Sequence, residues 1–190
     1  MNLTYLEYAA NGFYLLAVGL AARNNIHNWP FGIIGCALFA ALFYQVNLYA
    51  EVALMLFFIA TNVVGWYQWG RQGGVSTVSS VALPRLLGYG AAALVVTAMY
   101  GLVLHNYTDA YAPFVDSAIL MFSMIAQFLL MNRKLQTWWF WLIVNTLAVP
   151  LYVSRELYLT AVVYSGFWFN AWYGWYMWRK LYAKACADNN

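Results

Sequence analysis

Seven long apolar runs, separated by short polar segments, constrain this chain more than any other feature. The sequence is 65% hydrophobic and 8% charged, whereas a soluble domain carries about 25% charged residues and cannot cover its surface with so few. A helix of about 20 apolar residues spans a bilayer. We therefore predict an all-α integral membrane protein with seven transmembrane helices. The spans are expected at residues 3–22, 30–44, 49–69, 84–104, 114–131, 138–153 and 157–178.

The basic residues predict how these helices are oriented. With seven crossings, one side of the membrane receives eight Lys and Arg residues and the other receives only Arg155. Loops rich in Lys and Arg stay in the cytoplasm, so the N-terminus is predicted outside and the C-terminus inside. The eight are Arg23, Arg71, Arg85, Arg133, Lys134, Arg179, Lys180 and Lys184.

An internal repeat relates the first three spans to the last three. The segment Gly-Trp-Tyr-x-Trp at 65–69 recurs 109 residues later at 174–178. The same offset pairs Trp29 with Trp138, Phe31 with Phe140, Phe13 with Phe122 and Glu7 with Asp116. Two three-helix units in the same orientation need one more crossing between them, so a 3+1+3 parallel repeat is predicted, an arrangement that transporters use. The predicted segments are 1–71 (first repeat), 72–113 (a Gly- and Ser-rich flexible linker and the fourth span), 114–180 (second repeat) and 181–190 (a cytoplasmic tail).

Several of these residues also resemble a known family, the PnuC-type vitamin transporters. The first-half segments are Leu6-Glu7, Phe31-Gly32-Ile33-Ile34, Leu48-Tyr49-Ala50 and the stretch from Asn62 through Gly65-Trp66-Tyr67 and Trp69 to Arg71. The second-half residues are Asp116-Ser117, Arg133-Lys134, Trp141, Asn145 and Asn170. The resemblance covers nearly the whole chain, and the Gly-Trp-Tyr-x-Trp segment is its most specific part.

The resemblance implies a SWEET-like fold in a bacterial inner membrane. It implies uptake of a B vitamin by facilitated diffusion, followed by metabolic trapping through phosphorylation, and assembly as a homotrimer. The branches of the family differ in cargo: nicotinamide riboside, thiamine or riboflavin. Nicotinamide riboside carriers have a Gln in the third span where this chain has Met55. Losing that amide favours the thiamine branch, with nicotinamide riboside as the alternative.

Polar side chains inside spans are candidate substrate contacts, because they are expensive in lipid. Asn145 is predicted near the middle of the 138–153 span, and Asn62 and Asn170 in the inner halves of theirs. An amide both donates and accepts hydrogen bonds, so it suits an aminopyrimidine or a carboxamide. The alternative role for each is a hydrogen bond between helices.

Aromatic residues provide a second set of candidates. Tyr164, Trp168, Trp172 and Trp175 share one helix face by their spacing, and a flat cationic vitamin would stack on such rings. Trp141 and Tyr152, which follows Pro150, are further candidates in the 138–153 span. The alternative is an aromatic belt at the membrane interface, which we prefer for the four cytoplasmic-edge rings, Trp66, Trp69, Trp175 and Trp178.

The remaining candidate is Glu7, predicted with Asp116 at the outer helix ends. These carboxylates either complement a helix N-terminus or attract a cationic vitamin. The two histidines lack metal-site spacing, so no metal, cofactor or enzyme activity is predicted. The expected partners are the vitamin and membrane lipid, not nucleic acid. The alternatives are a substrate-capturing or scaffold membrane subunit without transport of its own and, less favoured, a sugar carrier on the same fold.

Overall fold

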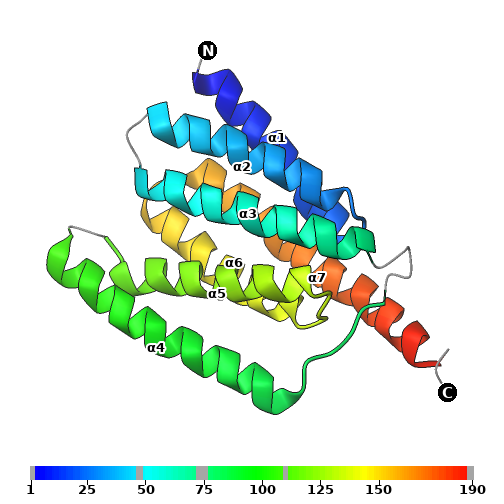
Figure 1. Cartoon of the computed structure of the whole chain (residues 1–190). Coiled ribbons are helices and arrows are strands. Elements are labelled where there is room, and N and C mark those ends of the chain that lie inside the picture. The colour runs from blue at the N-terminus through cyan, green and yellow to red at the C-terminus, as the bar shows by residue number, and fades with distance from the viewer. Residues whose placement is uncertain (1–2, 46–48, 72–76, 109–110, 188–190) are drawn as a thin grey trace. The chain divides into compact units, whose positions relative to one another are not determined.

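The computed structural model describes residues 3–45, 49–71, 77–108 and 111–187 (Figure 1). Over this part of the chain, seven helices form, each at a predicted span, which confirms the all-α fold. They are α1 (Leu3–Ala22), α2 (Asn28–Gln45), α3 (Tyr49–Arg71), α4 (Leu83–Tyr107), α5 (Pro113–Met131), α6 (Thr137–Ser154) and α7 (Tyr158–Ala187). Residues 46–48, 109–110 and 188–190, which include Leu48 of the Leu48-Tyr49-Ala50 segment and the end of the tail, lie outside the described residues.

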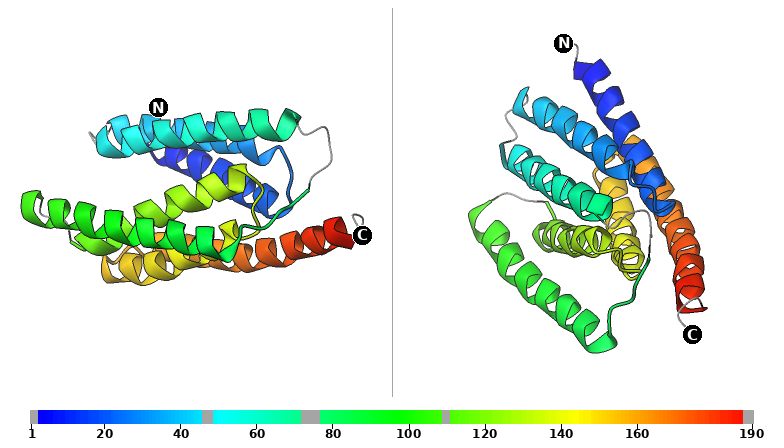
Figure 2. Two further views of the ribbon diagram at one scale, coloured as in Figure 1. Left: turned by 60° about the horizontal axis from the view of Figure 1, so that its bottom comes forward. Right: turned by 45° about the vertical axis from the view of Figure 1, so that its right-hand side comes forward.

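Helix α7 is longer than predicted. It was expected to end at Trp178, followed by a polar tail from 181, but the helix continues to Ala187 and extends past the start of α6 (Figure 2). The residues from Lys180 to Ala187 are mostly Ala, Lys and Leu, which are strong helix formers. Polarity marks the end of the apolar run here, but it does not end the helix.

Length and composition qualify four of the described helices as membrane spans on their own. These are Val52–Arg71, Leu83–Tyr107, Pro113–Met131 and Thr137–Ser154. Helices α1, α2 and α7 contain polar or interfacial residues, such as Glu7, Asn28 and the tryptophans of α7.

The chain forms two compact units, Met1–Thr77 and Val78–Asn190. In the first, α1 packs on α2 and α2 on α3; in the second, α4 packs on α5, α5 on α6 and α6 on α7. The core of the second unit contains Ala93 of α4 together with Phe122, Leu129, Phe140 and Val144 of α5 and α6. The fourth helix, predicted as part of a separate linker segment, thus belongs to the same compact unit as the second repeat.

The segment before α4 is held on the turn between α5 and α6. The Ser79 N–H donates to the Arg133 carbonyl (3.0 Å), and the Ser79 carbonyl accepts from the Leu135 N–H (2.9 Å). The Gln136 side chain accepts from the Val81 N–H (3.0 Å) and donates to the Ser80 hydroxyl (2.6 Å). The stretch 70–80 was predicted as a flexible linker; its residues 70–71 close α3, residues 79–80 are hydrogen-bonded to the α5–α6 turn, and residues 72–76 lie outside the described residues. The Gly- and Ser-rich composition indicated that this segment has no structure of its own. It could not show that the α5–α6 turn would hold the segment in place.

The repeat appears as matching backbone geometry in the two units, each considered by itself. After α1, Asn24 has φ 53°, and the N–H groups of Asn24 and Asn25 donate to the carbonyls of Ala21 and Leu20. After α5, at the same offset of 109, Arg133 has φ 47°. The N–H groups of residues 133 and 134 donate to the carbonyls of Leu130 and Leu129. Both are Schellman endings, in which a left-handed residue closes the helix.

Ring packing repeats at the same offset. The ring centroids of Phe13 and Phe31 are 5.9 Å apart with an interplanar angle of 29°, and those of Phe122 and Phe140 are 5.9 Å apart with an angle of 32°. A second pair is edge-on in each unit: Trp29 with Trp69 at 5.1 Å and Trp138 with Trp178 at 5.5 Å. All four of these tryptophans are at most 2% exposed. The expectation of a lipid-facing belt is therefore wrong for Trp69 and Trp178, because a tryptophan of the preceding helix covers each of them.

The buried tryptophans depend on two glycines. A Cβ added at Gly65 would lie 2.5 Å from the Trp29 ring, and one at Gly174 would lie 2.6 Å from the Trp138 ring. Only glycine lets the ring approach the helix backbone so closely. The repeated glycine of the Gly-Trp-Tyr-x-Trp segment is thus a packing requirement between neighbouring helices.

Replacing Gly174 or Gly65 by Ala should destabilise the fold. Overpacking a well-packed core costs typically about 1–3 kcal/mol, and both rings also make an edge-on contact with a second tryptophan. The measurement is the thermal unfolding midpoint of the purified protein in detergent. Gly166→Ala in α7 is the matched control: its Cβ meets nothing within 4 Å, so the gain in helix propensity should leave the midpoint unchanged or raised. Equal midpoints for Gly166→Ala and Gly174→Ala would contradict this account.

Candidate functional site

Asn145 is the least exposed of the polar residues predicted to contact the substrate. It lies in the middle of α6 and is 3% exposed. Its spacing from Trp141 and Tyr152, four and seven residues, puts all three on one face of α6. Trp141 also packs on the apolar core of the second unit. A buried amide in a membrane helix is a candidate for function, since its burial is costly.

Two other predicted residues meet across α6 and α7. The rings of Tyr152 on α6 and Tyr164 on α7 have centroids 4.8 Å apart. One turn further along α7, Trp168 Nε1 donates to the hydroxyl of Thr146 on α6 (3.1 Å). Trp172 follows at 6.0 Å from Trp168, with its ring 46% exposed. We call Tyr152, Tyr164, Trp168 and Trp172 the aromatic face.

Thr146 was not among the predicted residues. Its hydroxyl donates to the Leu142 carbonyl (2.7 Å) and so has a lone pair left to accept from Trp168. This bond fixes the orientation of the indole. A threonine is common in membrane helices, and its position next to Asn145 was the only signal available in the sequence.

Asn170 lies apart from the aromatic face. It follows Trp168 by two residues, which is about 200° around a helix. It is half-buried and has an interaction of its own. The structure therefore does not place Asn170 on the same face of α7 as the tryptophans.

Asn62 and Glu7 belong to the first unit. The Asn62 amide nitrogen donates to the Phe58 carbonyl (2.7 Å), and its oxygen lies against Gly32, where an added Cβ would come within 2.8 Å. The hydrogen bond lies within α3, so both roles considered for Asn62 stay predictions. Glu7 is exposed on α1 and takes part in no ion pair of the described residues. Both carboxylate roles considered for Glu7 stay predictions.

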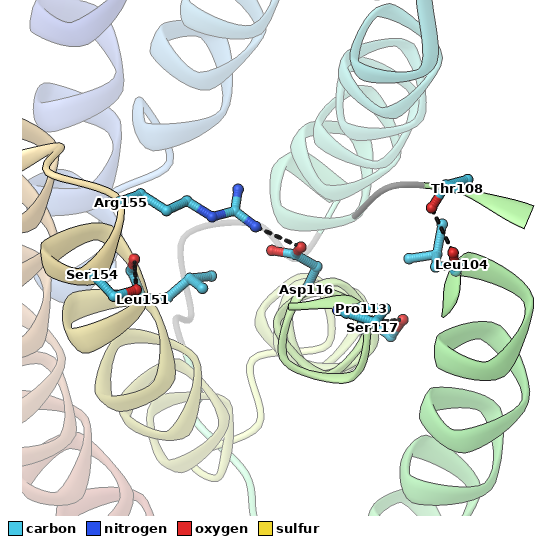
Figure 3. Close-up of polar contacts among 8 residues, drawn as sticks. All are labelled: Leu104, Thr108, Pro113, Asp116, Ser117, Leu151, Ser154 and Arg155. Carbon is cyan, nitrogen blue, oxygen red and sulfur yellow. Dashed lines mark hydrogen bonds and ion pairs between the residues drawn. The ribbon is translucent and has the colours of Figure 1, made fainter. Parts of the chain in front are cut away.

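Asp116, the repeat partner of Glu7, does form an ion pair. Figure 3 shows the Arg155 side chain reaching from the end of α6 to Asp116 in the first turn of α5, with Nη2 2.8 Å from Oδ2. The Arg155 guanidinium also lies over the Tyr111 ring at 5.3 Å. The sequence placed Arg155 and Asp116 on the same side of the membrane but did not pair them. The contact ties the ends of two helices together.

The second unit thus offers a surface suited to a flat, polar, cationic molecule. The aromatic face supplies ring surfaces for stacking and cation–π contact. Asn145 supplies an amide in a buried setting, where hydrogen bonds discriminate between ligands. Nothing in this set is a nucleophile with a base beside it, so the described arrangement suits binding and not covalent chemistry.

Comparison with known proteins gives a consistent picture. A family described as nicotinamide mononucleotide transporter matches residues 4–180. The chain is 29% identical to the nicotinamide riboside transporter PnuC of Escherichia coli strain K12, over 93% of this chain and 86% of that protein. It is 30% identical to the PnuC of Neisseria mucosa, over 88% of this chain and 69% of that protein. It is also 24% identical to the riboflavin/roseoflavin transporter RibM of Streptomyces davaonensis, over 86% of this chain and 79% of that protein.

A solved structure shares the fold. The crystal structure of the vitamin B3 transporter PnuC superimposes with a TM-score of 0.75 at 26% sequence identity, covering 95% of this chain and 83% of that one.

The Asp116–Arg155 pair should contribute modestly to stability. Both side chains are about one-third exposed (31% and 32%), so a coupling of about 0.2–1 kcal/mol is expected. A double-mutant cycle of Asp116→Asn and Arg155→Gln on the unfolding free energy measures it, with Glu7→Gln as the control that lacks an ion-pair partner. A coupling of zero would show that the contact does not stabilise the protein.

Proposed function

Because the chain belongs to the nicotinamide mononucleotide transporter family, which includes the PnuC proteins, it is a vitamin transporter and not an enzyme, and we propose that it takes up nicotinamide riboside by facilitated diffusion. It is a multi-pass membrane protein. In the proposal it lies in a bacterial inner membrane with its N-terminus outside and its C-terminus in the cytoplasm, and assembles as a homotrimer.

The choice of nicotinamide riboside is supported by the relatives, of which those from Escherichia coli and Neisseria mucosa carry that name. The cationic pyridinium ring of this vitamin matches the aromatic face, and its carboxamide can exchange hydrogen bonds with Asn145. The proposal is carried by Trp168, whose indole N–H is hydrogen-bonded to Thr146, and by the exposed Trp172, because these rings supply stacking. The buried amide of Asn145 on α6 supplies the polar discrimination.

Facilitated diffusion is supported by where the acidic residues lie. Among the residues that the structure describes, the acidic ones lie in the first two turns of a helix or just after its last residue: Glu7, Glu51, Asp116 and Glu156. A proton-driven carrier uses carboxylates in the middle of its membrane helices. Net accumulation then comes from phosphorylation of the vitamin after entry.

Thiamine is the second candidate, and Met55 supports it. This residue is half-buried on α3 and has no amide to bind a carboxamide. Thiamine also carries a cationic ring and would use the same aromatic face. The two vitamins differ in their polar groups, so they differ in what Asn145 must recognise.

The purified chain in liposomes should take up labelled nicotinamide riboside with saturation, down its gradient only. Dissipating ion gradients with ionophores should leave the rate unchanged. Unlabelled nicotinamide riboside should compete more strongly than thiamine. If thiamine competes more strongly, the second candidate replaces the first, and if no vitamin enters, the chain is a capture or scaffold subunit.

Trp168→Leu should weaken vitamin binding. Losing about 1–2 kcal/mol of cation–π contact raises the Kd roughly 5- to 30-fold. Isothermal titration with nicotinamide riboside measures this. Trp139→Leu is the control, because Trp139 is an exposed tryptophan on α6 outside the aromatic face (44% exposed). Equal effects of the two substitutions would remove the aromatic face from the proposed site.

A further inference from the structure

A groove on α3 is not part of the aromatic face or of the core. It has a volume of about 400 Å³ and is lined by Val63, Trp66, Tyr67, Gly70 and Arg71. These positions follow one stripe of the helix over its last turns. The tryptophan and tyrosine rings are 46% and 63% exposed. The groove is therefore an open surface whose wall is aromatic and whose end is cationic.

Arg71 is positioned at the end of this groove by a neighbouring ring. Its guanidinium carbon lies 5.4 Å from the Tyr67 ring centroid, and Nη1 donates to the Tyr67 hydroxyl (3.2 Å). A guanidinium has five N–H donors, so most of them remain available for a ligand. A Cβ at Gly70 would meet nothing within 4 Å, which leaves the space beside Arg71 open.

The same pair of groups recurs on α7. At the offset of 109, Lys180 lies over the Tyr176 ring, with Nζ 4.3 Å from the centroid. Arg179 lies over Trp175 at 5.3 Å. A cation held over an aromatic ring one turn before it thus occurs at the end of α3 and at the matching position of α7, about two turns before α7 ends.

We propose that the α3 groove binds one anionic phospholipid. Its phosphate lies on Arg71, and the part of an acyl chain next to the headgroup lies along Trp66 and Val63. From residue 63 to residue 71 the helix rises about 12 Å, so the stripe passes from apolar surface to the headgroup level. Trp and Tyr favour that level, and Arg binds phosphate through two parallel hydrogen bonds. In the proposed orientation this end of α3 is cytoplasmic, where the leaflet is anionic.

A phospholipid fits these observations better than a soluble phosphate compound. The exposed Val63 continues the groove away from the cation, along an apolar helix. A soluble anion gains nothing from that surface, whereas an acyl chain covers it. The proposal rests on the proposed orientation but not on the identity of the vitamin.

Native mass spectrometry of the full chain in detergent tests the site. Phosphatidylglycerol and phosphatidylcholine with the same acyl chains are compared as ligands. The wild type should prefer phosphatidylglycerol. Arg71→Gln should reduce that preference roughly fivefold, the effect of one cation near a phosphate, while Arg71→Lys should keep most of it. The matched control is Arg85→Gln, because Arg85 is an exposed arginine at the start of α4 and outside the groove.

Three results would overturn the proposal. The first is an equal loss of the phosphatidylglycerol preference in Arg71→Gln and Arg85→Gln, and the second is equal binding of the two lipids by the wild type. The third is displacement of phosphatidylglycerol by millimolar inorganic phosphate or a nucleotide. Vitamin uptake and the unfolding midpoint are measured on the same variants. A failure to transport with intact lipid preference would contradict the proposed function alone, and the reverse would contradict the lipid site alone.

Discussion

The insertion of a tryptophan against a glycine of the next helix is the contact on which each repeat depends. Trp29 packs against Gly65 and Trp138 against Gly174, and a second tryptophan closes each ring from the side. In lipid, helices gain nothing from hiding apolar surface, so association depends on close packing. A small residue facing a large ring provides that packing. Because both units contain this tryptophan–glycine contact at the same offset, the sequence repeat corresponds to a repeated packing contact between helices.

This arrangement separates the tryptophans by role. Trp69 and Trp66 lie about 60° apart around α3, yet Trp69 is 2% exposed and Trp66 is 46% exposed. On α7, Trp178 is buried in the same way, while Trp172 stays open on the aromatic face. The rings buried between helices hold the unit together. The exposed ones are free to contact vitamin or lipid.

Helix α4 and the segment before it make the second unit larger than the first. The hydrogen bonds of Ser79 and Gln136 join this segment to the α5–α6 turn, and Ala93 enters the α5–α6 core. At the other end of α5, Asp116 holds Arg155. The second repeat is therefore braced at both ends of α5, and the aromatic face lies on the α6–α7 pair of the same unit.

The sequence by itself determined the membrane fold, the seven helices and the offset of 109 that relates the repeats. These follow from composition and spacing, which are properties of the chain alone. The tertiary structure decided which side chains meet. Asp116 and Arg155 are 39 residues apart, Thr146 and Trp168 are 22 apart, and no local pattern pairs them. It also decided that Trp69 is covered while Trp66 stays exposed, because exposure depends on which neighbouring helix covers a face.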